Sequence, residues 1–183
     1  ESLAVNMGTG SQVSRLYVPN NSKDQYIDTK PFFEKKLQTV THIPAGRTFN
    51  YLNSNYFRDT NFWENLNSIN YKSGKIPKLT VDLNIFESNW KYKKNLFENL
   101  NLKKHKLSSI YESILWEFCC QYIEAIDILN TDNLRSLIIC GGMLKKIHFV
   151  QQFFNCQEQF STNFPTFPID ETLLGLHLIS LEY

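Results

Sequence analysis

The strongest periodic pattern in this chain lies between residues 107 and 129, where apolar side chains recur every three or four positions. They are Leu107, Ile110, Tyr111, Ile114, Leu115, Phe118, Cys119, Tyr122, Ile123, Ile126 and Leu129. Because an α-helix makes a turn about every 3.6 residues, this spacing predicts a long amphipathic helix of about six turns. We interpret Trp116, Tyr122 and Cys119–Cys120 as core groups of this helix, rather than as a stacking platform or nucleophiles.

Extended and helical patterns alternate along the rest of the chain. The period-two and continuous apolar segments predict strands at 2–7, 11–18, 31–33, 37–41, 79–83, 134–140 (a central strand) and 164–167. Further helices are expected at 46–57, 60–70 with Thr60 as N-cap, 144–154 and 170–181, the last beginning at Asp170–Glu171. A polar loop is expected at 19–30. This order of elements predicts an α/β domain.

Length and charge limit the class of protein. The 183 residues carry a formal net charge of +1 and are 42% hydrophobic, which is typical of a globular chain with a substantial core. No strong positive field predicts nucleic acid or an anionic membrane as a partner, and no apolar run is long enough for a membrane span. Because Glu1 directly precedes a predicted strand, we expect the chain to be part of a longer protein.

Cysteines and histidines give no sign of a metal site. The four cysteines are Cys119, Cys120, Cys140 and Cys156, and none forms a CxxC pair. The four histidines are also scattered, so no set has the spacing of metal ligands. This cysteine usage favours a reduced, cytoplasmic setting.

Glycine is scarce and concentrated. Six of the 7 glycines occur at three places: Gly8 and Gly10, Gly46, and the late group Gly141, Gly142 and Gly175. Around Gly8 and Gly10, the backbone amides and the hydroxyls of Thr9 and Ser11 could bind phosphate. An ordinary hairpin turn explains these two glycines equally well. At Gly46 and at Gly141–Gly142, nucleotide contacts and plain helix starts both remain open interpretations.

Taken in order, five segments resemble the C-terminal half of FGGY-type carbohydrate kinases, most of all the sedoheptulokinase-like branch. The segments are Leu3–Ser14, Lys30–Phe33, Thr39–Arg47, Ile139–Met143 and Asp170–Leu176. No single segment is specific, and the resemblance depends on their order. It is vaguest over 58–106.

The resemblance implies an actin-like, RNase H-type fold: a mixed sheet flanked by helices, forming one of two domains that bind ATP and Mg²⁺ between them. Residues 1–183 would be the C-terminal, nucleotide-binding domain. By position, phosphate would be bound by Gly8, Thr9, Gly10, Ser11 and Gly46. The nucleoside would lie against Asn50, Gly141, Gly142, Met143 and Lys146, where Lys146 replaces an Asn of some members.

The resemblance assigns no catalytic residue and no metal ligand to this chain. In the family the general base is an Asp shortly before the Gly-Thr-Gly turn, and the Mg²⁺-associated Asp lies in the N-terminal half. We therefore expect an N-terminal domain of the same protein and a sugar or polyol substrate as partners, and an inactive isolated domain. The alternative is a non-catalytic nucleotide-binding domain that regulates or assembles with a partner. A cleft face without its second domain could also make the chain dimerise.

Overall fold

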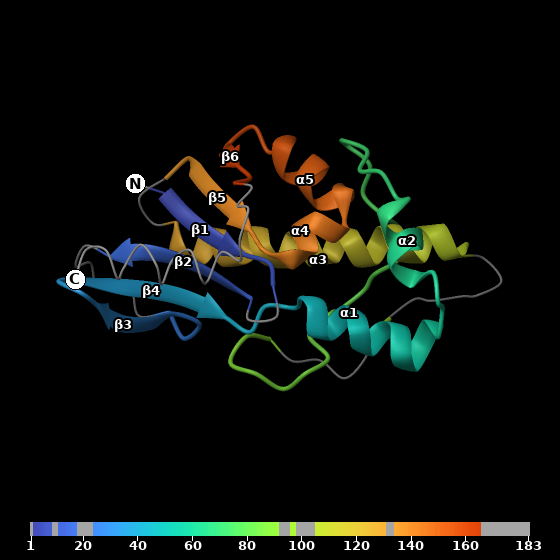
Figure 1. Cartoon of the computed structure of the whole chain (residues 1–183), viewed down its shortest axis with the longest axis horizontal. Coiled ribbons are helices and arrows are strands. Elements are labelled where there is room, and N and C mark those ends of the chain that lie inside the picture. Colours follow the sequence, from blue (N-terminus) through green and yellow to red (C-terminus); the bar gives the residue numbers. More distant parts are fainter. Residues whose placement is uncertain are drawn as a thin grey trace.

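A mixed sheet organises the part of the chain that this computed structural model describes, namely residues 2–8, 11–17, 24–91, 96–97, 105–130 and 134–165. Its six described strands have the order β3-β4-β2-β1-β5-β6 (Figure 1). They are β1 (Ser2–Asn6), β2 (Gln12–Tyr17), β3 (Asp28–Phe32), β4 (Lys35–Thr41), β5 (Ser136–Cys140) and β6 (Ser161–Asn163). The pairs β1–β2, β2–β4 and β3–β4 are antiparallel, whereas β1–β5 and β5–β6 are parallel.

Alternation of side chains decides which face of the sheet is buried. Leu3 and Val5 of β1 are fully buried and stand opposite Leu137 and Val13 in the neighbouring strands. Because successive side chains of a strand point to opposite faces, these residues form one continuous apolar layer. Ile138, on the other face, is 38% exposed.

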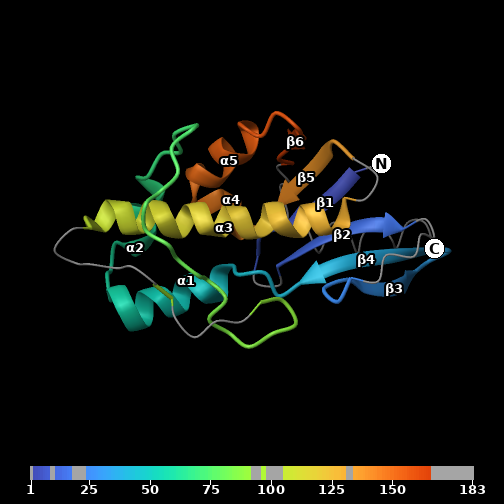
Figure 2. The same ribbon diagram turned by 180° about the vertical axis from the view of Figure 1, so that it is seen from behind.

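One long helix, α3 (Leu107–Leu129), lies across the buried face, as Figure 2 shows from behind. Its bounds are those that the apolar period predicts. Phe118 and Tyr122 of this helix are fully buried, and the edge of one ring meets the other at a centroid distance of 5.1 Å. Phe118 also meets the ring of Phe49 at 5.3 Å, which joins α3 to the helix that follows β4.

The predicted helix 46–57 is confirmed, with a change of pitch: α1 (Gly46–Leu52) continues as the π-helical segment η1 (Asn53–Phe57). The next helix, α2 (Phe62–Asn67), is shorter than predicted, and Thr60 is not its N-cap. Asp59 instead organises this turn, since its carboxylate accepts hydrogen bonds from the amide of Asn61 at 2.9 Å and from Asn65 Nδ2 at 2.7 Å.

The predicted helix 144–154 is two helices, α4 (Gly142–Lys146) and α5 (His148–Asn155). Ile147 between them is extended, with φ −135° and ψ 100°, and is fully buried. Asn67 stabilises the second start, because its Oδ1 accepts a hydrogen bond from the amide of His148 at 3.0 Å. The buried, extended Ile147 and the cap from the distant Asn67 therefore divide into two helices a segment whose sequence pattern predicts one.

Three strand predictions need correction. Residues 79–83 form no strand: Val81 makes only an isolated bridge to Phe97. The predicted central strand 134–140 begins at Ser136 and has one exposed apolar side chain, although it does lie between β1 and β6. β3 begins at Asp28, inside the predicted loop 19–30. The helix predicted at 170–181, with Asp170, Glu171 and Gly175, lies outside the described residues, as does most of 164–167.

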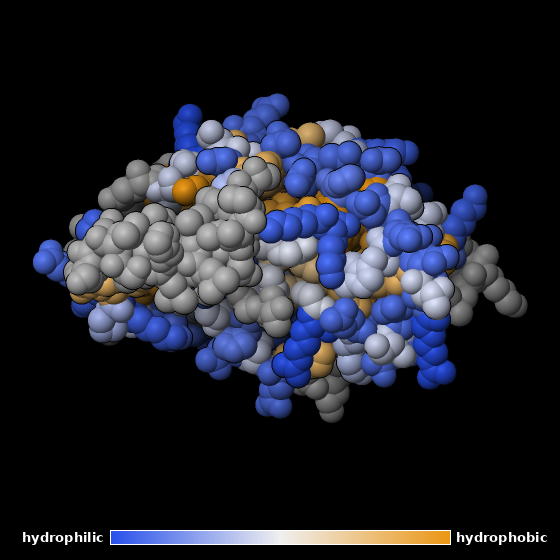
Figure 3. All heavy atoms as spheres, viewed as in Figure 1, coloured by the Kyte–Doolittle hydropathy of each residue, from blue (hydrophilic) through white to orange (hydrophobic). Residues whose placement is uncertain are grey.

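The visible surface of the described residues in Figure 3 is mostly hydrophilic, with apolar atoms showing between hydrophilic ones near α4. Among the described helices, none is both long and apolar enough to cross a membrane.

Candidate functional site

The ends of β1 and β5 bring two of the glycine segments side by side. Because these strands are parallel neighbours, Met7–Gly8 and Gly141–Gly142 leave the sheet at the same edge (Figure 1). Asn6 lies between them: its Oδ1 is 3.1 Å from the place that a Cβ of Gly8 would occupy, and 2.8 Å from that of Gly141. Sequence reasoning did not single out Asn6, since only the parallel pairing of β1 with β5 reveals this position.

Backbone hydrogen bonds hold these two segments together. The Met7 amide donates to the Cys140 carbonyl oxygen at 2.8 Å, and the Met143 amide donates to the Met7 carbonyl oxygen at 3.0 Å. Gly141 is forced to be glycine by this approach, because its φ is 113° and an added Cβ would lie 2.6 Å from the Met7 carbonyl carbon. Packing alone therefore accounts for Gly141.

Gly142 and Gly46 differ from Gly141 in having space around them. Gly142 is exposed, and apart from its chain neighbours and the backbone of its own helix, no atom of the described residues lies within 4 Å of the place that a Cβ would occupy there. An added Cβ on Gly46, the first residue of α1, would meet only the Met143 sulfur, at 3.8 Å, among those residues. The buried Met143 therefore lies beside Gly46 through its sulfur and is bonded to Met7 through its amide. It connects Gly46 to the segments of Gly8 and of Gly141–Gly142. We call the edge formed by Gly8, Gly46, Gly141 and Gly142 the glycine edge.

The remaining predicted site residues have varied surroundings. Asn50 is exposed one turn into α1, and the Ser11 hydroxyl donates a hydrogen bond to the carbonyl oxygen of Ile43. Lys146 Nζ lies 4.6 Å from the ring centroid of Trp63 in α2, a cation–π contact. Thr9 and Gly10 lie outside the described residues.

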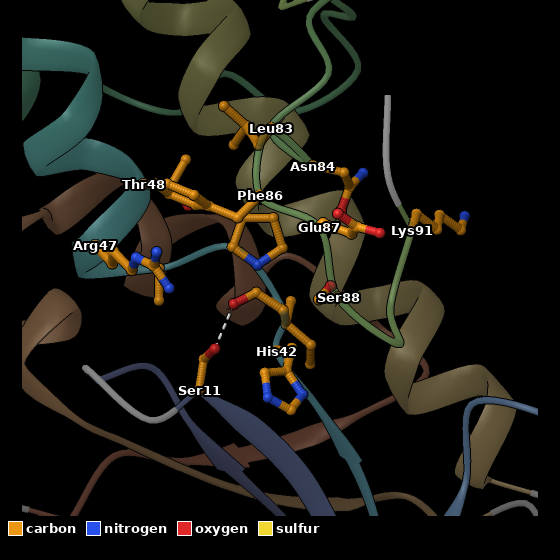
Figure 4. Close-up of a pocket in the computed structure, with 13 residues that line it drawn as sticks. Ser11, His42, Arg47, Thr48, Leu83, Asn84, Phe86, Glu87, Ser88 and Lys91 are labelled. Atoms are coloured by element: carbon orange, nitrogen blue, oxygen red, sulfur yellow. Dashed lines mark hydrogen bonds between the residues drawn. The ribbon is translucent and has the colours of Figure 1, made fainter. Parts of the chain in front are cut away.

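A cavity of about 110 Å³ borders the start of α1 (Figure 4). Ser11 and His42 line it from the sheet side, Arg47 and Thr48 line it from α1, and residues of the loop 83–91 line its other side. The lining residues of that loop are Leu83, Asn84, Phe86, Glu87, Ser88 and Lys91. The sequence carries no motif that would have placed this loop against the predicted phosphate-binding segments.

Burial controls the titratable groups of α3. Burial is the main cause that raises the pKa of the Cys119 thiol well above its ordinary value, and that of Cys120 to about 11. These thiols therefore stay protonated at neutral pH, which agrees with their interpretation as packing groups. All four cysteines are free, and no group of three His, Cys, Asp or Glu side chains in the described ranges could hold a metal ion.

Comparison with solved structures identifies proteins whose fold is similar to that of this chain. A ligand-bound xylulose kinase from Lactobacillus acidophilus matches with a TM-score of 0.66 at 15% identity, over 83% of this chain and 32% of that one. A xylulose kinase from Bifidobacterium adolescentis matches with a TM-score of 0.67 at 10% identity, over 93% of this chain and 34% of that one. A third, from Rhodospirillum rubrum, matches with a TM-score of 0.60 at 10% identity, over 79% of this chain and 30% of that one.

These matches establish the fold. The described residues have the mixed sheet flanked by helices of the actin-like ATPase fold, shared with carbohydrate kinases. The chain spans about a third of the length of the kinases that it matches. No protein-family model matches the sequence, and no curated protein sequence does.

Proposed function

We propose that this chain is the nucleotide-binding domain of an ATP-dependent carbohydrate kinase, which transfers the γ-phosphoryl group of Mg·ATP to a hydroxyl of a sugar or polyol. The observation that carries the proposal is the glycine edge, where segments far apart in sequence meet beside the parallel strands of a fold shared with xylulose kinases. In open α/β sheets, ligands bind outside the carboxyl ends of the strands.

The glycine edge suits a nucleotide. Gly142 offers an exposed backbone without a side chain, against which a flat base can lie, and Gly46 lets a phosphate or ribose approach the start of α1. Gly8 is the first residue of the predicted phosphate-binding turn. ATP would supply the phosphoryl group, and Mg²⁺ would supply the positive charge that offsets the negative charge of the phosphates. The residues of this chain would bind and orient the nucleotide.

The general base and the metal ligands belong, in this proposal, to the N-terminal domain. The isolated chain would then bind nucleotide weakly and transfer no phosphoryl group. The sedoheptulokinase-like branch remains the finer proposal from sequence resemblance, and the acceptor sugar would be selected largely by the N-terminal domain.

A non-catalytic nucleotide-binding domain is the second candidate. The contact of Lys146 with Trp63 favours it, because the resemblance implies an Asn near adenine at this position in some members. Turnover by the full-length protein distinguishes the two candidates. A panel of sugars and polyols with Mg·ATP should include a phosphorylated substrate if the protein is a kinase, and none if it only binds nucleotide.

Both candidate functions require that this chain binds a nucleotide at the glycine edge, and this requirement can be tested directly. Titration of the ¹⁵N-labelled chain with ADP should shift the backbone amides of Gly46 and Gly142. Gly142→Leu, which adds bulk where the structure leaves space, should weaken binding at least tenfold. Asn163→Leu adds the same side chain at an exposed site on the edge strand β6 and should change nothing. Equal ADP affinity in the Gly142 and Asn163 variants would refute the proposed site.

A further inference from the structure

Another cavity, of about 500 Å³, lies where the chain turns from η1 into α2 and meets the start of α3 (Figure 2). Four aromatic rings line it, those of Tyr56, Phe57, Phe97 and Tyr111, so we call it the aromatic cavity. Its volume lies within the roughly 300–1,000 Å³ that is typical of small-molecule sites. None of the residues assigned above to the nucleotide is among its described lining residues, and it shares none of them with the cavity beside α1.

Asp59 is the one charged residue among the described residues that line the aromatic cavity. Its Oδ2 accepts a hydrogen bond from Asn65 Nδ2 at 2.7 Å and lies 3.4 Å from the Tyr111 hydroxyl. Burial, and after it the charge of Asp59, raises the pKa of Tyr111 to about 12, so this hydroxyl keeps its proton and can donate toward the carboxylate. Within the described residues, no Lys, Arg or His forms an ion pair with Asp59. Those residues therefore leave its negative charge without a counter-ion.

An unusual backbone conformation presents this carboxylate to the cavity. The π-helical segment η1 ends at Arg58, which is left-handed with φ 50° and ψ 38°, a conformation that is uncommon outside glycine. The Arg58 amide donates to the Asn53 carbonyl oxygen at 2.6 Å, and the Asp59 amide donates to Asn53 Oδ1 at 3.0 Å. Asn53 therefore fixes the turn that carries Asp59. Short π-helical segments within helices are frequent at functional sites.

The lining selects the class of ligand. An anion would meet the like charge of Asp59, and a metal ion would need several oxygen ligands where the described lining supplies one carboxylate. A neutral apolar molecule would take water away from that carboxylate without offsetting its charge. An organic ammonium ion satisfies both features, because its positive charge is attracted by the carboxylate and by the faces of aromatic rings, while its carbon groups pack against those rings.

We propose that the aromatic cavity binds a small quaternary ammonium compound, whose N-methyl groups contact the rings of Tyr56, Phe57 and Tyr111 and whose charge is offset by Asp59. Phe57 and Tyr111 form a fixed wall, since their ring centroids lie 5.1 Å apart and Tyr111 is only 2% exposed. Leu107, which also lines the cavity, gives an apolar substituent of the ligand a surface to pack against. The chain thereby has a binding site for a cation, separate from the site proposed for the anionic nucleotide.

The test is a titration of the ¹⁵N-labelled chain with choline and with benzyltrimethylammonium, at constant ionic strength and without nucleotide. At least one should shift the backbone amides of Asp59 and Tyr111 and the side-chain amide of Asn65. Its neutral counterpart for choline is 3,3-dimethylbutan-1-ol, in which a carbon replaces the charged nitrogen, and this alcohol should bind at least tenfold more weakly than choline where choline binds. Asp59→Asn should weaken ammonium binding at least tenfold, whereas Asp28→Asn, which removes the same charge at an exposed site on β3, should leave it unchanged.

Tyr56→Leu provides a variant that keeps the fold, should Asp59→Asn fail to fold. Tyr56 is 54% exposed, so its replacement by another apolar side chain costs little stability. Loss of the aromatic ring should weaken ammonium binding at least threefold. Phe33→Leu removes a ring that is 51% exposed on the turn between β3 and β4, and it should leave the affinity unchanged.

The proposal would be overturned by the absence of shifts with both ammonium compounds, by equal affinity for choline and its neutral counterpart where choline binds, or by equal ammonium affinity of the wild-type chain and a folded Asp59 or Tyr56 variant. Competitive displacement of the ammonium compound by ADP would also overturn it, because the cavity would then belong to the nucleotide. Gly142→Leu should leave ammonium binding unchanged. Because these titrations contain no nucleotide, they can succeed when ADP fails to bind, and so the two proposals fail separately.

Discussion

The backbone amide of Met143 donates a hydrogen bond to the carbonyl oxygen of Met7, 3.0 Å away, and so joins the start of α4 to the end of β1. Two segments separated by most of the chain are thereby held at backbone contact distance. The residue between β5 and α4 must then pass very close to Met7, which leaves no room for a side chain at Gly141. Its neighbour Gly142 faces open space. Adjacent glycines thus have separate roles, one in packing and one available to a ligand.

Gly141→Ala should destabilise the fold strongly. The backbone at Gly141 has φ 113° and ψ 164°, a region that residues other than glycine scarcely adopt. The new Cβ would also lie 2.6 Å from the Met7 carbonyl carbon, and backbone atoms cannot move aside cheaply. We expect a loss of about 2–4 kcal/mol in the free energy of unfolding, measured by urea denaturation. A variant as stable as the wild-type chain would contradict the close approach.

Gly142→Ala should separate stability from binding. Apart from the chain neighbours of Gly142 and the backbone of its own helix, no described residue lies within 4 Å of the added methyl group. Alanine also favours the helical backbone of α4, so stability should stay equal or rise by up to about 1 kcal/mol. ADP affinity should fall nevertheless, because the methyl group stands where the base would lie. Urea denaturation and ADP titration of the same sample check both expectations. Unchanged ADP affinity would place the nucleotide elsewhere.

The actin-like fold was expected from the resemblance to FGGY-type kinases, whereas the α/β class of the domain was predicted from local signals of the sequence. The 3.6-residue period of α3 and the order of strands are signals of this kind. The break at Ile147 was not predictable, since it depends on burial and on a cap from Asn67, which lies far away in sequence. The cavity beside α1 was missed for a similar reason: the loop 83–91 has no periodic pattern, and only tertiary contact brings Asn84 and Phe86 to Arg47.

The contact between Lys146 and Trp63 should be a measurable cation–π interaction. Lys146 Nζ lies 4.6 Å from the ring centroid, and such contacts at partly exposed sites contribute about 0.5–1 kcal/mol. A double-mutant cycle of Lys146→Ala and Trp63→Leu should give a coupling energy in that range from urea denaturation. Lys72→Ala, which removes one exposed lysine elsewhere, should show no coupling to Trp63→Leu. Equal coupling in both cycles would mean that only net charge matters.

Glu117 gives the fold a pH dependence of definite sign. Burial is the main cause that raises its pKa above the ordinary value of 4.5, with nearby Asp82 and Glu124 adding to the effect and the Gln121 hydrogen bond and Lys91 opposing it. A carboxyl whose pKa is higher in the folded state favours folding while it is protonated, below its unfolded pKa. That stabilisation is lost as pH rises through the folded pKa.

At neutral pH, then, the wild-type chain bears the cost of a half-buried carboxylate, and Glu117→Gln should be the more stable protein. Gln keeps a side-chain oxygen that can still accept the hydrogen bond from Gln121 Nε2. Urea denaturation midpoints at pH 7 and pH 4 measure the effect: the advantage of the variant should be clear at pH 7 and should shrink at pH 4, where Glu117 is largely protonated. Glu158→Gln, at an exposed position of the same charge, should show little difference at either pH. An advantage of Glu117→Gln that is equally large at both pH values would mean that packing, rather than ionisation, causes it.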